Sequence, residues 1–177
     1  DKILVPTIRA MKKEGRPFKG CLYAGLMITK EGPKVVEFNC RFGDPETEVI
    51  LPLLEGDLGK IMLSCVKGNL KAGDVSWKKG YAVDVVMASE GYPRTHSSGD
   101  EIMGLEEAGK DCLLFHAGTV SKKGKYYVNG GRVLNVVATA PTLKEARDKA
   151  YAGVAKIHWR GAQYRSDIAD KGLKHLK

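Results

Sequence analysis

The fold of this chain is decided by the stretch Val35-Val36-Glu37-Phe38-Asn39-Cys40-Arg41-Phe42-Gly43-Asp44-Pro45-Glu46. Residues 35–41 are predicted to form a β-strand, because apolar and polar residues alternate along them. Alternate side chains of a strand point to opposite faces, about 7 Å apart along each face. One predicted face is therefore apolar and the other is polar. The apolar face carries Val36, Phe38, Cys40 and Phe42, and the polar face carries Glu37, Asn39 and Arg41.

The polar face of this strand has the side chains of a metal and phosphate site. Glu37 and Asn39 offer oxygen ligands of the kind that hold Mg²⁺ when substrate phosphates complete its coordination. Arg41 adds a planar guanidinium, which binds phosphate oxygens through paired N–H donors. Together the three side chains indicate phosphoryl chemistry, in which positioning and charge neutralisation provide most of the catalysis. The alternative is a half-buried strand whose polar face is simply solvated.

The residues on either side of this strand predict a β-hairpin and the start of a helix. Residues 21–29 form a second predicted strand, and residues 30–33 form a turn that contains Gly-Pro. Beyond the hairpin, Pro45 stops the strand and favours a helix start. The carboxylates of Asp44 and Glu46 thus follow the strand directly, at a position where functional sites are common. Helix capping is the alternative role for both carboxylates.

The rest of the sequence predicts a mixed α/β (α+β) fold in two parts. Helices are predicted over 3–14, 57–66 and, after the capping box Thr142-Leu143-Lys144-Glu145, 143–158. Strands are predicted over 81–89, 113–119, 125–128 and 133–140. The polar, glycine-containing stretch 68–80 is the predicted connection. We therefore expect a largely antiparallel sheet with helices on one face over residues 1–70. A small β-rich C-terminal domain with a packed helix is expected over residues 71–177.

A glycine turn is a second candidate for chemistry. Gly130-Gly131-Arg132 places backbone N–H groups beside a guanidinium, an arrangement suited to an anion. A β-hairpin turn is an equally good interpretation, since glycine supplies the positive φ that such turns require. The four histidines have no metal-ligand spacing. His116, in an apolar strand, is interpreted as a hydrogen-bonded core or rim residue.

Charge and composition argue against two classes of partner. The net charge of this 177-residue chain is +8, yet its lysines are scattered and do not interleave with the aromatic residues, which make up only 7%. We therefore expect a solvated basic surface and no nucleic acid. No apolar run approaches the about 20 residues that span a bilayer, so no membrane association is expected. The four cysteines form no CxxC pair and no zinc-ligand cluster, which fits a reducing cytoplasm.

Five motifs spread over nearly the whole chain point together to one family. They are Leu22-Tyr23-Ala24-Gly25-Leu26-Met27-Ile28-Thr29, Glu37-Phe38-Asn39-Cys40-Arg41-Phe42-Gly43-Asp44-Pro45-Glu46, Phe115-His116-Ala117-Gly118-Thr119, Gly130-Gly131-Arg132-Val133-Leu134 and Tyr164-Arg165-x-Asp167-Ile168. Through them the chain resembles the phosphoribosylamine–glycine ligases, which are the glycinamide ribonucleotide synthetases of the ATP-grasp superfamily. The second motif is specific, whereas the Gly-Gly-Arg turn alone would be a weak signal.

The resemblance implies an ATP-dependent carbon–nitrogen ligase of purine biosynthesis. Such an enzyme joins glycine to 5-phosphoribosylamine and cleaves ATP to ADP and phosphate through glycyl phosphate, with Mg²⁺ or Mn²⁺ as cofactor. Glu37 and Asn39 would bind the metal that bridges the ATP phosphates, and Arg41 would stabilise the transferring phosphoryl group. The implied substrate contacts are Asp44 and Glu46, for the amino group of glycine or the order of the site, and Arg132, for phosphoribosylamine.

The resemblance also implies that part of the enzyme is missing. Family chains are much longer and include an N-terminal domain, a lid-like lobe with nucleotide-clamping lysines and an adenine-binding hinge. We therefore expect residues 1–70 to be the last part of an ATP-grasp core and the missing N-terminal portion to be its partner. The start at Asp1 rather than Met agrees with a fragment, which should be inactive alone. Two alternatives remain: another ATP-grasp carboxylate–amine ligase, and a non-catalytic basic binding module.

Overall fold

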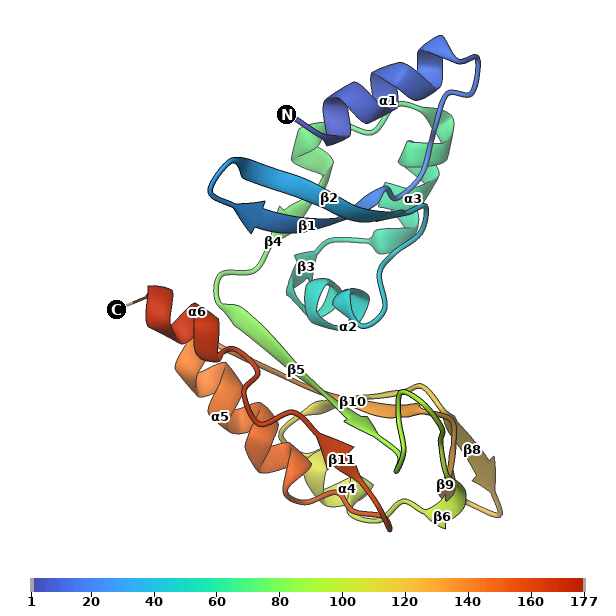
Figure 1. The fold of residues 1–177 in the computed structure, drawn as a ribbon, viewed down its shortest axis with the longest axis vertical. Coiled ribbons are helices and arrows are strands. Elements are labelled where there is room, and N and C mark those ends of the chain that lie inside the picture. Colours follow the sequence, from blue (N-terminus) through green and yellow to red (C-terminus); the bar gives the residue numbers. More distant parts are fainter. Residues whose placement is uncertain (1, 177) are drawn as a thin grey trace. The chain divides into compact units, whose positions relative to one another are not determined.

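The computed structural model describes residues 2–176, which divide into two compact units. Unit 1 comprises residues 2–47 and 54–77, and unit 2 comprises residues 48–53 and 78–176. Unit 1 contains α1 (Leu4–Lys13), β1 (Tyr23–Thr29), β2 (Gly32–Asn39), β3 (Leu54–Glu55), α3 (Leu58–Lys67), the 3-10 helix η2 (Ala72–Asp74) and β4 (Ser76–Trp77) (Figure 1). Helix α2 (Glu46–Ile50) starts in unit 1, and the 3-10 helix η1 (Leu51–Leu53) follows it in unit 2.

The remaining elements all belong to unit 2. They are β5 (Tyr81–Ala88), β6 (Ser98–Glu101), α4 (Leu105–Ala108), β7 (Leu113–His116), β8 (Thr119–Lys122), β9 (Lys125–Asn129), β10 (Arg132–Ala140), α5 (Leu143–Val154), β11 (Gln163–Tyr164) and α6 (Asp170–His175). The structure therefore combines helices with antiparallel sheets, and the predicted α/β (α+β) class is confirmed. No helix within residues 2–176 is both long and apolar enough to cross a membrane.

The predicted hairpin of unit 1 is present, but its second strand begins and ends earlier than predicted, at Gly32 and Asn39 instead of residues 35 and 41. Strands β1 and β2 pair antiparallel from Thr29 opposite Gly32 to Tyr23 opposite Asn39. Pairing stops there because β1 begins at Tyr23, so Cys40 and Arg41 lie in a bend beyond the strand. The prediction of a strand through residue 41 was wrong in this respect.

The apolar face of the hairpin is largely exposed. Among its side chains, Ile28 keeps 75% of its surface exposed and Val36 keeps 66%. The β1–β2 sheet has only two strands, and so few strands cannot bury an apolar face by themselves. The alternation that predicted the strand is therefore not matched by burial, because residues 33–38 of β2 are exposed on both faces.

The helices of unit 1 follow their sequence signals. Helix α3 begins where the Asp57 carboxylate accepts a hydrogen bond from the Lys60 amide at 3.1 Å. It ends at Gly68, whose φ of 73° lies in the left-handed region that glycine enters without strain. Helix α1 ends with Lys12 and Lys13 in its last turn, where cations are favoured.

The core of unit 2 is built on a four-stranded antiparallel sheet in the order β11-β5-β10-β7. Strand β10 is central, and its residues 133–138 are all buried. A second antiparallel sheet has the order β6-β9-β8. The buried apolar core of residues 2–176 lies entirely between Val83 and Trp159. This core gives unit 2 a rigid frame for the side chains described below.

Helix α5 covers the four-stranded sheet (Figure 1). Its buried residues recur at helical spacing, at Ala146, Ala150, Gly153 and Val154. A Cβ at Gly153 would lie 2.6 Å from the Cys112 Sγ, so glycine permits this close approach. The predicted cap is confirmed, because Thr142 Oγ1 accepts a hydrogen bond from the Glu145 amide at 3.2 Å. The helix ends at Val154 rather than 158, since His158 pairs with Met103 in a β-bridge.

Candidate functional site

The hairpin of unit 1 brings two predicted metal ligands onto one face. Tyr23 lies opposite Asn39, and Gly25 lies opposite Glu37. Residues directly opposite each other in an antiparallel pair share a face, so these four form one patch. The Asn39 amide donates a hydrogen bond to Glu37 Oε1 at 3.1 Å. The absence of a side chain at Gly25 leaves room for Glu37, because a Cβ there would lie 3.1 Å from its Cγ.

Glu46 joins this patch through Tyr23. The Tyr23 hydroxyl donates a hydrogen bond to Glu46 Oε1 at 3.0 Å. This hydrogen bond, with a smaller contribution from burial, raises the pKa of Tyr23 above its ordinary value. Gly43 is buried beneath Glu46, and a Cβ at Gly43 would overlap the carboxylate. Glu46 is thus held at the patch by a hydrogen bond and by a glycine that makes space for it.

Tyr23 is a residue of the candidate patch that the sequence did not single out. It appears in a family motif, yet nothing in its own local pattern distinguishes it from an ordinary strand tyrosine. The signal that would have found it is the hairpin register, which places it opposite Asn39. Counting residue pairs back from the turn at residues 30–31 does not by itself place Tyr23 opposite Asn39. The register also shifts between Gly25 and Leu26, and the sequence does not reveal this shift.

Two of the predicted residues lie outside the strand, at exposed positions. Arg41 is exposed in the bend after β2, and its Nη1 donates a hydrogen bond to the Phe42 carbonyl at 2.8 Å. Asp44 is exposed in the turn that precedes α2. The structure therefore brings Glu37, Asn39 and Glu46 together, while Arg41 is directed to the backbone of its neighbour.

The donor set on the patch fits a hard divalent cation that keeps other ligands. Within residues 2–176, no group of three or more His, Cys, Asp or Glu side chains could hold a metal ion. A carboxylate and an amide that already lie within hydrogen-bond distance can both turn an oxygen toward one cation. Mg²⁺ is commonly bound by one or two protein ligands plus waters and substrate phosphates. Glu37 and Asn39 match that pattern.

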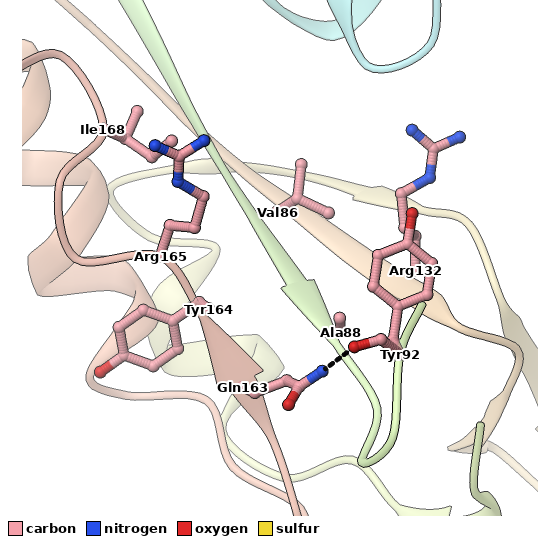
Figure 2. A pocket seen from close by; sticks show the side chains of 8 residues that line it. All are labelled: Val86, Ala88, Tyr92, Arg132, Gln163, Tyr164, Arg165 and Ile168. Atoms are coloured by element: carbon pink, nitrogen blue, oxygen red, sulfur yellow. Dashed lines mark hydrogen bonds between the residues drawn. The ribbon is translucent and has the colours of Figure 1, made fainter. Parts of the chain in front are cut away.

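Arg132 lines a pocket in unit 2. The pocket has a volume of about 470 Å³, within the range of about 300–1,000 Å³ that small-molecule sites occupy. Its lining residues are Val86, Ala88, Tyr92, Arg132, Gln163, Tyr164, Arg165 and Ile168 (Figure 2). Ala88 of β5 lies between Arg132 of β10 and Gln163 of β11, its partners in the sheet. The pocket is therefore built across three neighbouring strands.

A β-bulge and a tyrosine set the position of Arg132. The register between β10 and β5 shifts between Arg132 and Leu134, and such bulges redirect a side chain at the end of a strand. Tyr92 packs on the preceding residue, because a Cβ at Gly131 would lie 2.5 Å from its ring. The Gln163 side-chain amide in turn donates a hydrogen bond to the Tyr92 carbonyl at 3.0 Å (Figure 2).

The interpretation of the glycine turn as a β-hairpin was wrong. Strands β9 and β10 belong to different sheets, and Gly130 and Gly131 have no positive φ. The glycines are instead required by close packing. A Cβ at Gly130 would lie 3.0 Å from the Cα of Gly118. Ser89 holds the turn, because its amide donates to the Gly131 carbonyl and its hydroxyl to the Gly130 carbonyl, both at 2.8 Å.

His116 is a hydrogen-bonded residue at the edge of the fold, as predicted. Its Nδ1 lies 2.9 Å from the Thr119 hydroxyl, and its ring lies 4.4 Å from the ring of Tyr126. Partial burial lowers the pKa of His116 below its ordinary value. These contacts account for the side chain without a metal.

Comparison with known proteins agrees with this arrangement. The family model described as "Phosphoribosylglycinamide synthetase, C domain" matches residues 82–171, and "Phosphoribosylglycinamide synthetase, ATP-grasp (A) domain" matches residues 1–47. The chain is 52% identical over 169 residues to the phosphoribosylamine–glycine ligase of Caldanaerobacter subterraneus subsp. tengcongensis. It is 50% identical over 175 residues to the ligase of Synechocystis.

The similarity covers nearly all of this chain and a minor part of its relatives. It spans 96% of the chain against the Caldanaerobacter ligase and 97% against the Synechocystis ligase, but only 40% and 42% of those relatives. The crystal structure of the Thermotoga maritima ligase is similar with a TM-score of 0.78 at 42% identity, covering 90% of this chain and 39% of that one. The family that the five motifs predicted is therefore confirmed, and the chain belongs to the phosphoribosylglycinamide synthetase family.

Proposed function

We propose that this chain is part of a ligase that joins glycine to 5-phosphoribosylamine. ATP would be cleaved to ADP and phosphate, and the product would be glycinamide ribonucleotide. The observation that carries the proposal is the pairing of Glu37 with Asn39 on one hairpin face, where Tyr23 also binds Glu46; all three polar residues belong to the motif that is most specific for the family. Relatives of this chain bear the name phosphoribosylamine–glycine ligase.

The reaction divides into two steps with different demands on the protein. The glycine carboxylate first takes the terminal phosphoryl group of ATP, which gives glycyl phosphate and ADP. The amine of phosphoribosylamine then attacks the carbonyl carbon, and phosphate leaves. Both steps require negative charge to be neutralised and reactants to be held in place. The phosphoryl groups therefore need cationic partners, and the ammonium group of glycine needs carboxylate partners.

The residues of the hairpin and of the segment after it would meet the demands of the first step. Glu37 and Asn39 would hold Mg²⁺ or Mn²⁺, which neutralises charge on the ATP phosphates when it is bound. Arg41 would stabilise the transferring phosphoryl group, and its exposed position allows its guanidinium to exchange the Phe42 carbonyl for a phosphate oxygen. Asp44 and Glu46 would bind the ammonium group of glycine, and the Tyr23 hydroxyl would fix the orientation of Glu46.

The pocket of unit 2 would bind the second reactant, phosphoribosylamine. We assign Arg132 to phosphoribosylamine, because it lines a cavity of suitable size. The missing N-terminal portion of the enzyme would provide the remaining ATP contacts, and the whole enzyme would act in the cytoplasm. We place the border between the ATP-grasp core and the C-terminal domain after residue 70, within the polar connection.

Joining this chain to the missing portion of a relative tests the proposed function. A chimera with the N-terminal portion of the Caldanaerobacter ligase should consume ATP only with glycine and phosphoribosylamine, and the 177-residue chain alone should show no turnover. The control is the same N-terminal portion joined to the matching part of the Synechocystis ligase. An active control beside an inactive chimera of this chain would refute the proposal. Cleavage of ATP with another carboxylate in place of glycine would favour a different ATP-grasp ligase.

Substituting Tyr23 with Phe tests the role of Glu46. The change removes one hydrogen bond of about 1 kcal/mol, so KM for glycine in the chimera should rise about fivefold with little change in KM for ATP. Steady-state kinetics with each substrate varied in turn provide the measurement. Tyr126→Phe is the control, since Tyr126 packs on His116. Equal KM values for glycine in both variants would show that Glu46 does not depend on Tyr23.

A further inference from the structure

The pocket that contains Arg132 has a second guanidinium on its other side. Arg165 lies in the loop after β11, whereas Arg132 begins β10. Figure 2 shows the two guanidinium groups rising on either side of Val86, toward the same opening of the pocket. Two cations that flank one cavity attract an anion more strongly than either cation alone.

The loop that carries Arg165 is held by helix α5. The Tyr151 hydroxyl donates a hydrogen bond to the Arg165 carbonyl at 2.6 Å and accepts one from the Ile168 amide at 3.1 Å. Arg147 donates to the carbonyls of Ile168 at 3.0 Å and Ser166 at 3.2 Å. Four hydrogen bonds thus fix the backbone from Arg165 to Ile168.

Asp167 orients the Arg165 guanidinium without using all its donors. The Asp167 carboxylate accepts hydrogen bonds from Nε at 2.8 Å and from Nη2 at 2.7 Å. A guanidinium has five N–H donors, so three of them are left after this pair. The pair also raises the pKa of Arg165 above its ordinary value, so the charge is permanent. Arg165 is therefore a guanidinium that Asp167 holds in place, with its charge partly offset by that carboxylate and three N–H donors left.

The surface between the two arginines is apolar. Val86 and Ala88 form its floor on β5, and Ile168 and the ring of Tyr164 line the same cavity. A cavity with an apolar floor and cations at its edge suits a ligand that combines a compact sugar ring with an anionic group. A free inorganic anion would gain nothing from the apolar floor.

We propose that Arg165 and Arg132 together bind the phosphate group of a sugar-phosphate substrate, whose ring lies over Val86 and Ala88. The proposal rests on the ligase function proposed above, in which this substrate is 5-phosphoribosylamine, and it adds Arg165 as a binding residue. Arginine pairs bind phosphate through several charge-assisted hydrogen bonds, each stronger than a neutral one.

Calorimetric titration of the 177-residue chain with ribose 5-phosphate tests the proposal at low ionic strength. Ribose 5-phosphate should bind, and D-ribose should not. Both Arg165→Gln and Arg132→Gln should weaken binding about tenfold, because each removes one charged donor group. Arg160→Gln is the matched control, since Arg160 pairs with Asp100 at 3.1 Å and does not line the pocket. Its affinity should equal that of the unchanged chain.

Two results would overturn the proposal. One is a chain that does not bind ribose 5-phosphate, and the other is equal affinity in Arg165→Gln and Arg160→Gln. Kinetics of the chimera separate this proposal from the ligase function. An active chimera in which Arg165→Gln leaves KM for phosphoribosylamine unchanged contradicts the pocket alone. The opposite result contradicts the ligase function alone. In that case the pocket binds ribose 5-phosphate as expected, but the chimera makes no glycinamide ribonucleotide while the Synechocystis control does.

Discussion

Substituting Glu37 with Gln should lower kcat of the chimeric ligase by about a hundredfold or more, the range seen when one charge-stabilising group is removed from an active site. The change removes the negative charge of Glu37 but retains an oxygen that can accept the 3.1 Å hydrogen bond from Asn39. The fold of the hairpin should therefore persist while affinity for the divalent cation falls. The measurement is kcat as a function of Mg²⁺ concentration.

Glu31→Gln is the matched control for this substitution. Glu31 lies in the turn of the same hairpin, pairs with Lys34 at 2.8 Å and is far more exposed than a ligand would be, with 79% of its side-chain surface accessible. Its loss should leave kcat and the Mg²⁺ dependence unchanged. Comparable activity in the two variants would exclude Glu37 as a metal ligand and would leave the polar face of β2 merely solvated.

Substituting Gly104 with Ala should destabilise unit 2 by about 3 kcal/mol or more. Gly104 has φ of 84° and precedes α4, and a Cβ there would overlap the carbonyl oxygen of Lys156. The backbone of Met103 is tied to His158 by hydrogen bonds of 3.0 and 3.2 Å, so the two segments cannot separate freely. Urea unfolding followed by far-ultraviolet circular dichroism gives the change in free energy.

Gly124→Ala separates the two causes of this destabilisation. Gly124 has a similar φ of 78°, but nothing lies within 4 Å of a Cβ placed there. It should therefore lose only about 1–2 kcal/mol, the cost of a left-handed backbone for an L-residue. If Gly104→Ala is no more destabilising than Gly124→Ala, the close approach of Lys156 has no energetic weight.

Local patterns in the sequence predicted most of the helices and strands. Alternation identified β2 and its chemical face, and the signals at Asp57 and Thr142 correctly started α3 and α5. The short strands β3, β4 and β11 were not predicted, since two residues carry no periodicity. Strand β6 was not predicted either, because its pairing with β9 depends on partners 26 and 31 residues away. Local propensity cannot encode such a partner.

The sequence pattern placed candidate site residues together only where they lie on the same strand. Glu37 and Asn39 are two residues apart on β2, so alternation placed them together. The link between Tyr23 and Glu46 crosses 23 residues and depends on the hairpin register. The placement of Arg165 opposite Arg132 depends on β5 lying between β10 and β11, a strand order that sequence spacing does not reveal. The need for glycine at 130 and 131 likewise comes from neighbours distant in sequence.

The location of the buried apolar core has a consequence for the hairpin that carries Glu37 and Asn39. That core lies between Val83 and Trp159, so β1 and β2 depend on a two-stranded ladder. Such a ladder opens by local unfolding at a small fraction of the global free energy. A ligand that binds only the closed hairpin shifts this opening equilibrium toward the closed state. If a cation binds only the closed hairpin, as proposed, its loading and the ordering of β2 are one thermodynamic event, and its apparent affinity includes the cost of closing the hairpin.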